Sequence, residues 1–183
     1  MPTKKRSRSN RTTRRTAVRA IPRGFHSVTP YLAVVGGDAA IEFYKRAFGA
    51  KELARQSTPN GRIIHARLKI GDSIVMLSDV FEGSDRTAPS TVGTSTVTLH
   101  IYTPDVDAMW NRAVDAGAKI TMALDDQYWG ERYGHLLDPF GHRWSLSTPI
   151  KISKAVADAK RKEAFAAFSK GEHPSKEPRY TDI

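Results

Sequence analysis

The sequence predicts an α+β domain made of two successive βαβββ modules and followed by a C-terminal helix. Three observations support this prediction. Several short segments are rich in β-branched residues or alternate apolar with polar residues, as strands do. Two segments carry apolar residues at helical spacing. The order of one strand, one helix and three strands occurs twice, and Gly117-Ala118-Lys119 ends the second helix as Gly49-Ala50-Lys51 ends the first, 68 positions earlier.

The first module is expected within residues 25–80. Residues 28–35 are apolar and β-prone, which indicates a strand, and the two glycines that follow end it. Asp38 is a residue type that caps helices, and the apolar stripe in residues 39–48 indicates a helix that packs on a sheet. Gly49 is a typical helix terminator.

Three more strands complete this module, at residues 51–57, 62–70 and 73–78. The turn between the first two contains Asn60-Gly61, a pair typical of hairpins. The second strand alternates, which predicts one apolar and one polar face. Ile64, Ala66, Leu68 and Ile70 would form the apolar face.

The second module is expected at residues 95–149, after a polar linker at residues 81–94. It contains a strand at 96–102, a helix at 106–116, and strands at 120–123, 132–137 and 142–147. Asp138-Pro139-Phe140-Gly141 predicts a turn in which the Asp138 carboxylate accepts backbone N–H bonds, with His142 exposed beside it. After the turn, Trp144 would point into the core and Arg143 to the opposite face.

The two ends of the chain differ from the domain between them. The formal net charge is +10, but residues 1–24 hold nine Lys/Arg and no acid, whereas residues 25–149 hold 12 basic and 14 acidic residues. The arm at 1–24 is predicted to be disordered, because it has few apolar residues to bury. In residues 150–183, Ser153 can cap a helix over 154–169, and a loose tail follows.

Several classes of protein do not fit the sequence. No apolar run is long enough for a transmembrane helix, and there is no cysteine for disulfide or thiolate chemistry. The sequence contains no phosphate-binding loop and no dinucleotide-binding glycine pattern. We expect a cytoplasmic protein without membrane association.

The stretch Tyr-Trp-Gly-Glu-Arg-Tyr-Gly (residues 128–134), followed by Asp-Pro-Phe-Gly-His-Arg-Trp-Ser-Leu (residues 138–146), resembles the signature of PhnB-like proteins. These belong to the vicinal oxygen chelate superfamily, which includes glyoxalase I, bleomycin-resistance proteins and extradiol dioxygenases. The resemblance covers roughly residues 28–148. It implies that the modules curl into a cupped eight-stranded mixed sheet with the helices outside, and that two chains form a homodimer.

The resemblance also implies four metal-binding positions, on the first and fourth strand of each module. They correspond to Thr29, Met76, Thr98 and Ser145, none of which is a usual ligand for a divalent metal. We therefore expect no metal and no other cofactor. Substitute ligands could come only from His65, His100, His135, His142 and Asp138.

A set of aromatic and polar residues would line the cup instead. Aromatic rings with polar tips suit planar or amphipathic ligands, and an arginine can pair with an anion. The set is Tyr31, Thr98, His100, Tyr102, Trp129, Tyr133, Arg143 and Ser145. The alternative for Trp129 and Tyr133 is that they fill the cup as part of the core.

Three functions remain open from the sequence. The chain could bind a small amphipathic or planar anion without metal, as bleomycin-resistance proteins bind their ligand. It could be an enzyme resembling glyoxalase-type lyases or dioxygenases, with a substitute metal or acid–base chemistry by His100 or Tyr133. It could also associate with nucleic acid, without sequence preference, through residues 1–24.

Overall fold

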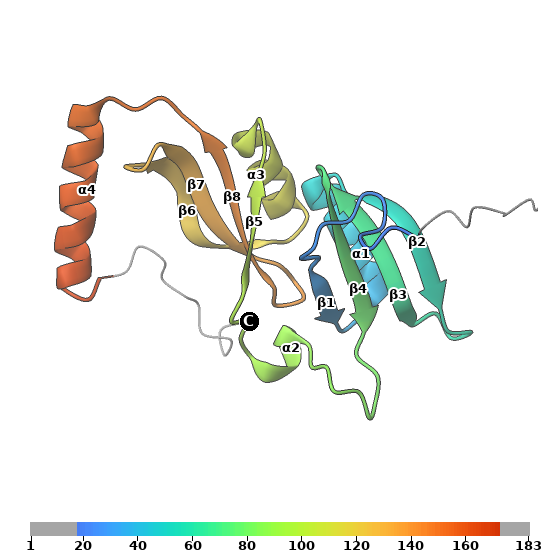
Figure 1. Ribbon diagram of the computed structural model, residues 1–183. Helices are drawn as coiled ribbons and strands as arrows, with labels where there is room; N and C mark the ends of the chain where they lie inside the picture. Colours follow the sequence, from blue (N-terminus) through green and yellow to red (C-terminus); the bar gives the residue numbers. More distant parts are fainter. Residues whose placement is uncertain (1–17, 173–183) are drawn as a thin grey trace, which may run out of the picture.

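The computed structural model describes residues 18–172, which form two consecutive βαβββ modules, as the sequence predicted (Figure 1). The first module consists of β1 (Tyr31–Val34), α1 (Gly37–Phe48), β2 (Lys51–Ser57), β3 (Ile63–Ile70) and β4 (Ser73–Asp79). The short helix α2 (Pro89–Val92) lies in the predicted linker. The second module consists of β5 (Thr98–Tyr102), α3 (Val106–Asp115), β6 (Lys119–Gln127), β7 (Glu131–Leu137) and β8 (Arg143–Pro149), and α4 (Lys154–Ser169) follows it.

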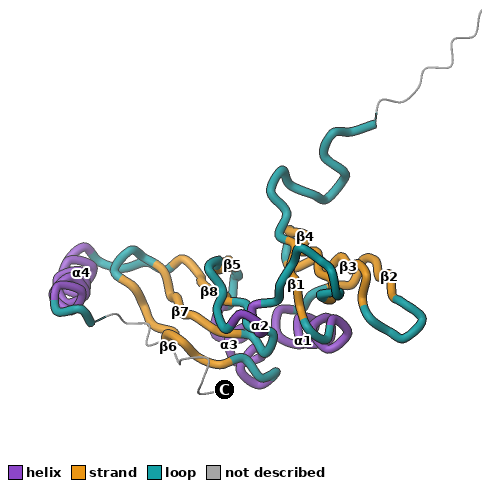
Figure 2. Tube along the Cα trace, turned by 90° about the horizontal axis from the view of Figure 1, so that it is seen from below, coloured by secondary structure: helices purple, strands orange, loops and turns teal. Residues whose placement is uncertain are grey.

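Each module forms its own four-stranded mixed sheet, in the orders β1-β4-β3-β2 and β5-β8-β7-β6. The first and last strands of each module are parallel neighbours, and the other neighbours are antiparallel. The eight strands therefore form two sheets, with β1 and β5 at facing edges (Figure 1). Helices α1 and α3 pack together on the same side of both sheets (Figure 2). We call the opposite side of each sheet its open face.

An aromatic cluster in the core joins the two modules. Tyr44 and Phe48 on α1 lie 5.5 Å and 4.6 Å, between ring centroids, from Trp144 on β8. All three side chains are buried. Removing side chains of this size from water contributes about 1.5–3 kcal/mol each. The first module's helix is therefore held against the second module's sheet.

Asp138 adds a polar link to this apolar contact. Its Oδ1 accepts the backbone N–H groups of Phe140 and His142, as expected for its turn. Its Oδ2 accepts a hydrogen bond from the Tyr44 hydroxyl and another from the Trp144 indole, each 2.8 Å long. A buried carboxylate is costly unless it is hydrogen-bonded, and here four donors satisfy it.

The prediction that His142 is exposed was wrong. The residue is 8% exposed, and its Nε2 donates to the carbonyl oxygen of Ala33 on β1 at 3.1 Å. The sequence showed only that His142 follows a turn. It did not show that the turn lies against the edge of the other module.

Two details at the start of the first module also differ from the prediction. Strand β1 begins only at Tyr31, so Thr29 precedes it, and the Thr29 hydroxyl donates to the His26 carbonyl oxygen. Asp38 does not cap α1, because Gly36 is the N-cap residue, with φ 86°. The N–H groups of Gly36 and Gly37 both donate to Asp79 Oδ1 at 2.9 Å, and Asp38 pairs with Arg55 on β2 instead. A carboxylate from the end of β4 thus binds the start of the helix.

The apolar face of β3 contains Ile63 rather than Ile64. Ile63 is fully buried, whereas Ile64 is 48% exposed. The pairing of β2 with β3 is irregular here, since Gln56 pairs with His65 and Ser57 with Ile63. A bulge adds one residue to one strand and reverses the side-chain alternation beyond it.

Helix α4 has the bounds that the sequence predicted, and the Ser153 hydroxyl accepts the Val156 N–H at 3.3 Å as its cap. None of its residues is buried. It contacts the β6 side of the second sheet, where Lys160 pairs with Asp125 and the Phe165 ring lies 6.0 Å from that of Tyr128. No helix within residues 18–172 is long and apolar enough to span a membrane. Most of the predicted basic arm and of the predicted tail lies outside the described residues.

Candidate functional site

The open face of the second sheet carries a cluster of rings and polar groups. The alternation of β5 places Leu99 and Ile101 against the core, so the side chains between and beside them point to the open face. On β8, Trp144 and Leu146 are buried in the core in the same way. We call the following residues the open-face cluster: His100, Tyr102, Trp129, Glu131, Tyr133, His135, Ser145 and Ser147.

His100 lies at the base of this cluster. Its Nδ1 lies 2.7 Å from the Ser145 hydroxyl and its Nε2 lies 3.1 Å from the Ser147 hydroxyl. Partial burial lowers the pKa of His100 below its ordinary 6.5, although nearby Glu131 acts in the opposite direction. Partial burial therefore favours the neutral ring, which lies between two hydroxyls that can each donate or accept.

Glu131 joins two exposed rings of the cluster, those of Tyr102 and Trp129. Its carboxylate accepts a hydrogen bond from the Tyr102 hydroxyl at 3.0 Å and another from the Trp129 indole at 3.2 Å. The hydrogen bond to Glu131 raises the pKa of Tyr102. Tyr102 is 64% exposed and Trp129 is 45% exposed, so the rings keep large apolar faces open to solvent.

Tyr133 lies between these groups. Its ring is nearly parallel to that of His100, with centroids 5.8 Å apart, and edge-on to Trp129 at 5.4 Å. Its hydroxyl lies 2.6 Å from His135 Nε2. The cluster is therefore a fixed set of rings whose polar tips bond to one another, and its flat surfaces could stack on a planar molecule.

The structure brings together five of the eight residues predicted to line the cup: His100, Tyr102, Trp129, Tyr133 and Ser145. Thr98 lies on the same face of β5, beside Arg143 on β8. Tyr31 lies on the other sheet, where its hydroxyl bonds to His65 at 2.9 Å. The Arg143 Nε donates to the carbonyl oxygen of Ser95, shortly before β5, at 3.1 Å.

Sequence reasoning missed Glu131 and Ser147 as members of the cluster, and it considered His135 only as a metal ligand. The signal for Glu131 was its place within the aromatic stretch 128–134. Its contact with Tyr102, 29 positions earlier, depends on the fold. Ser147 and His135 could have been found from strand alternation, since Ser147 pairs with Tyr133 and His135 with Ser145.

The residues at the predicted metal positions do not form a ligand set. Across the parallel strands, Met76 pairs with Tyr31 rather than Thr29, and Ser145 pairs with His100 rather than Thr98. In these two pairs, His100 is the residue whose side chain commonly binds metal ions. Both of its ring nitrogens are hydrogen-bonded to serine hydroxyls. Within residues 18–172, no three His, Asp or Glu side chains are grouped so that they could hold a metal ion.

Comparison with known proteins identifies the family. The glyoxalase/bleomycin resistance protein/dioxygenase superfamily model matches residues 24–146. The uncharacterized protein Rv0887c of Mycobacterium tuberculosis is 44% identical over 128 residues, which cover 68% of this chain and 75% of that protein. YjdN of Escherichia coli is 25% identical over 141 residues, which cover 66% of this chain and 93% of that protein.

Solved structures agree with this assignment. TioX from Micromonospora sp. ML1 superposes with a TM-score of 0.55 at 29% identity, covering 70% of this chain and 99% of TioX. A PhnB protein from Bacillus cereus, described as a putative 3-demethylubiquinone-9 3-methyltransferase, shares the fold with a TM-score of 0.54 at 19% identity, covering 67% of this chain and 99% of that one. The chain therefore belongs to the glyoxalase/bleomycin resistance protein/dioxygenase superfamily, with PhnB-like structural neighbours.

Proposed function

We propose that this chain binds a small planar or amphipathic molecule on the open face of its second sheet. The observation that carries this proposal is the open-face cluster, in which half-exposed aromatic rings are fixed by hydrogen bonds between their polar tips. Rings that are already ordered lose little conformational freedom when a ligand stacks on them. Exposed aromatic area with polar groups around it is typical of small-molecule sites.

The cluster favours a ligand that can donate hydrogen bonds. Glu131 is an acceptor beside the two outer rings, and Asp125 lies on the same face, paired across the strands with Tyr133. The anionic ligand expected from the sequence depended on Arg143, whose guanidinium donates to the backbone carbonyl of Ser95. We therefore propose that an anionic group, if the ligand carries one, is not held by Arg143.

The arrangement supports binding better than acid–base catalysis. A histidine can act as general base for a serine hydroxyl that it hydrogen-bonds, but Ser145 and Ser147 are only 2% and 0% exposed, so their hydroxyls are not open to a substrate. The Tyr133 hydroxyl is likewise engaged with His135. A ligand that is recovered unchanged after long incubation with the protein would support binding. More than one molecule of altered product per protein chain would instead support an enzyme.

We also propose that the chain forms a homodimer. Within residues 18–172, aromatic side chains of the open face such as Tyr102 and Trp129 are exposed. Exposed apolar patches often mark protein–protein contacts. A second copy that lies over the open faces would cover these side chains and enclose a ligand bound to the open-face cluster.

A thermal-shift screen against planar aromatic compounds tests the binding proposal. A compound that binds only the folded state raises the melting temperature. The shift should be lost or strongly reduced in Trp129→Ala and kept in Leu53→Ala, which removes an apolar side chain of similar exposure from β2. A hit whose shift is the same in both variants would place its site elsewhere and contradict the proposal.

A further inference from the structure

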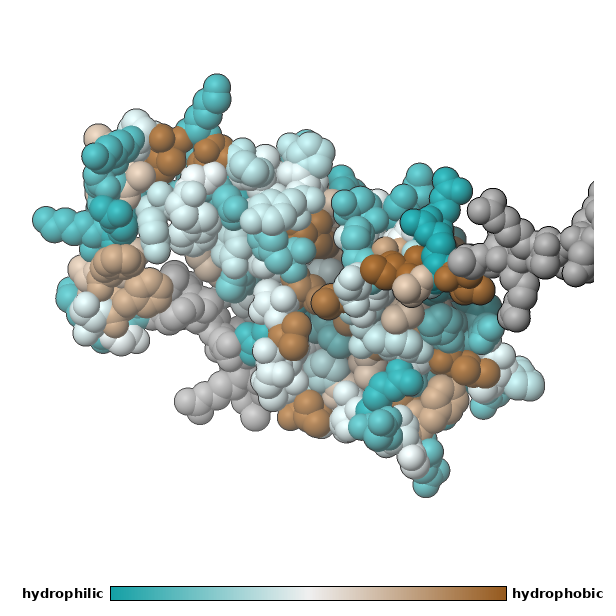
Figure 3. Space-filling view, in the orientation of Figure 1, coloured by the Kyte–Doolittle hydropathy of each residue, from teal (hydrophilic) through white to brown (hydrophobic). Residues whose placement is uncertain are grey.

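A separate cavity lies between the two modules, away from the open-face cluster. It measures about 560 Å³ and is bounded by β1, β5, the linker and α2. Figure 3 shows hydrophobic side chains on the surface between the modules. The cavity walls include Leu32 from β1, Val92 from α2, and Val97 and Leu99 at the start of β5. Its size is that of a small-molecule site and its walls are mainly apolar.

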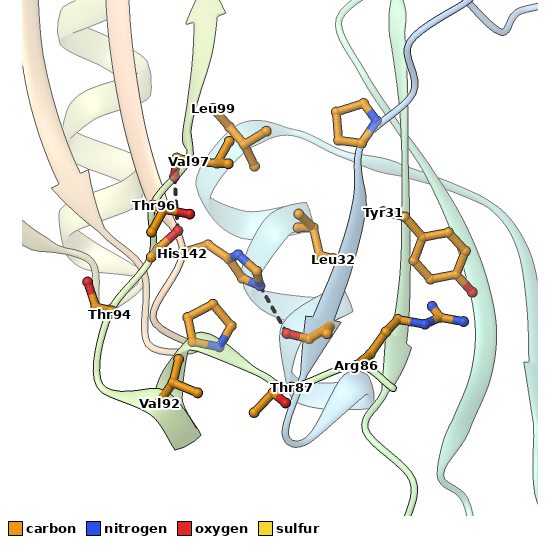
Figure 4. Close-up of a pocket in the computed structure, with 14 residues that line it drawn as sticks. Tyr31, Leu32, Arg86, Thr87, Val92, Thr94, Thr96, Val97, Leu99 and His142 are labelled. Atoms are coloured by element: carbon orange, nitrogen blue, oxygen red, sulfur yellow. Dashed lines mark hydrogen bonds between the residues drawn. The ribbon is translucent and has the colours of Figure 1, made fainter. Parts of the chain in front are cut away.

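One cation lies at the rim of this cavity. The Arg86 guanidinium lies 4.4 Å above the centre of the Tyr31 ring, and Figure 4 shows both on one side of the cavity, with Thr94 and Thr96 on the other. Arg86 also donates to the hydroxyl of Ser78 at 3.3 Å. In residues 18–172, no carboxylate lies within ion-pair distance of Arg86, unlike Arg55 and Arg132, which each pair with acids.

The contacts of Arg86 hold its position without neutralising its charge. The carbon of the guanidinium lies over the face of the Tyr31 ring, and the Tyr31 hydroxyl is itself hydrogen-bonded to His65. A planar guanidinium held in this way still presents N–H groups for the bidentate recognition of an oxyanion. At the opposite wall, Leu99 and Val97 offer only apolar area.

We propose that this cavity binds a small amphipathic oxyanion, with its carboxylate, phosphate or sulfonate on Arg86 and its apolar body between β1 and β5. This site is independent of the proposed function of the open-face cluster, because it uses none of the cluster's residues. In this proposal Arg86 is the anion-binding group, a role that the sequence analysis predicted for Arg143.

Two fluorescent probes with similar aromatic bodies can test the proposal. Anilinonaphthalene sulfonate (ANS) carries an oxyanion, and phenylnaphthylamine does not. Because a charge-assisted hydrogen bond contributes about 1.5–3 kcal/mol, Arg86→Gln should weaken ANS binding about 10- to 100-fold. The same variant should bind phenylnaphthylamine as the wild type does. Arg86→Lys should keep part of the ANS affinity, because lysine keeps the positive charge but lacks the planar guanidinium with its two parallel N–H donors.

Control variants locate the effect. Arg112→Gln removes an exposed arginine from α3 and should leave both affinities unchanged. Val92→Asp places a negative charge in the cavity wall and should abolish ANS binding, whereas Val156→Asp, at a similarly exposed position on α4, should not. Circular dichroism of each variant, all substituted at exposed positions, confirms that the fold is kept.

Three results would overturn the proposal. The first is an Arg86→Gln variant that binds ANS as tightly as the wild type. The second is an equal loss of both probes in that variant, which would show that Arg86 shapes the cavity rather than holding the anion. The third is ANS binding that appears only when the protein is diluted to monomer, because a second copy of the chain would then be the occupant of the cavity.

Discussion

Asp138 shows how one residue can have both a local and a long-range role. Its Oδ1 closes the turn between β7 and β8, while its Oδ2 accepts bonds from α1 and from β8. Burial raises the pKa of this carboxyl, and the charge of His142 and the hydrogen bonds act in the opposite direction. The sequence pattern predicted the turn, because a turn depends on adjacent residues. The Tyr44 contact, 94 positions away, depends on how the modules pack.

Substitution at this link should reduce the free energy of unfolding. Tyr44→Phe removes one hydrogen bond and should cost about 1–2 kcal/mol. Asp138→Ala leaves four donors without their acceptor and should cost about 3–5 kcal/mol. Urea denaturation measures both, and Tyr128→Phe is the control, because the described residues make no hydrogen bond to the Tyr128 hydroxyl; it should change stability by no more than about 0.5 kcal/mol. An Asp138→Ala protein as stable as the wild type would show that the link is not needed.

His100 gives the stability a pH dependence. Its pKa is lowered in the folded state by partial burial, so the fold favours the neutral ring. The stability that this preference contributes is fully present at a pH above 6.5, the ordinary pKa of histidine. It is lost as the pH falls through the lowered pKa of the folded state. The wild type should therefore lose more stability between neutral and mildly acidic pH than His100→Gln does. If the free energy of unfolding changes with pH by the same amount in both proteins, the role given to His100 would be contradicted.

At the scale of elements, the sequence predicted most helices and strands because their patterns are local. Helix α4 agrees to the residue, since the Ser153 side chain that caps it is a signal contained in the local sequence. The prediction for β3 was partly wrong, because a bulge in its pairing with β2 places Ile63, rather than Ile64, on the buried face. The candidate site was predictable where strand alternation decides, as at His100 and Ser145. The hydrogen bonds of Glu131 with Tyr102 and of Arg143 with Ser95 could not be predicted, because these partners lie on other parts of the fold.

Gly134 shows why one position of β7 has no side chain. A Cβ at this glycine would lie 2.6 Å from the indole ring of Trp110 on α3 and 3.0 Å from the backbone of Leu124 on β6. Gly134→Ala should therefore destabilise the protein by about 1–3 kcal/mol through overpacking. Gly83→Ala is a partial control, because its site is open but its positive φ adds some strain. Equal stability of Gly134→Ala and the wild type would mean that α3 can move away from the sheet.

At the scale of the whole molecule, two sheets share one core, and the part of the chain that the structure describes leaves exposed side chains on the open faces. If a second copy covers them, sedimentation at tens of micromolar should show a dimer. A monomer in wild-type samples at that concentration would refute the homodimer.

The central claim is that a planar ligand binds at the open-face cluster, and the indole N–H signals of the three tryptophans test it most directly. Trp129 is 45% exposed and bonded to Glu131, whereas Trp110 and Trp144 are 7% and 2% exposed. In an NMR titration with a compound that raises the melting temperature, the Trp129 indole signal should shift with saturation and the other two should move little. Assignment follows from the signal that disappears in Trp129→Phe. A saturating titration that leaves the Trp129 signal in place would contradict the account.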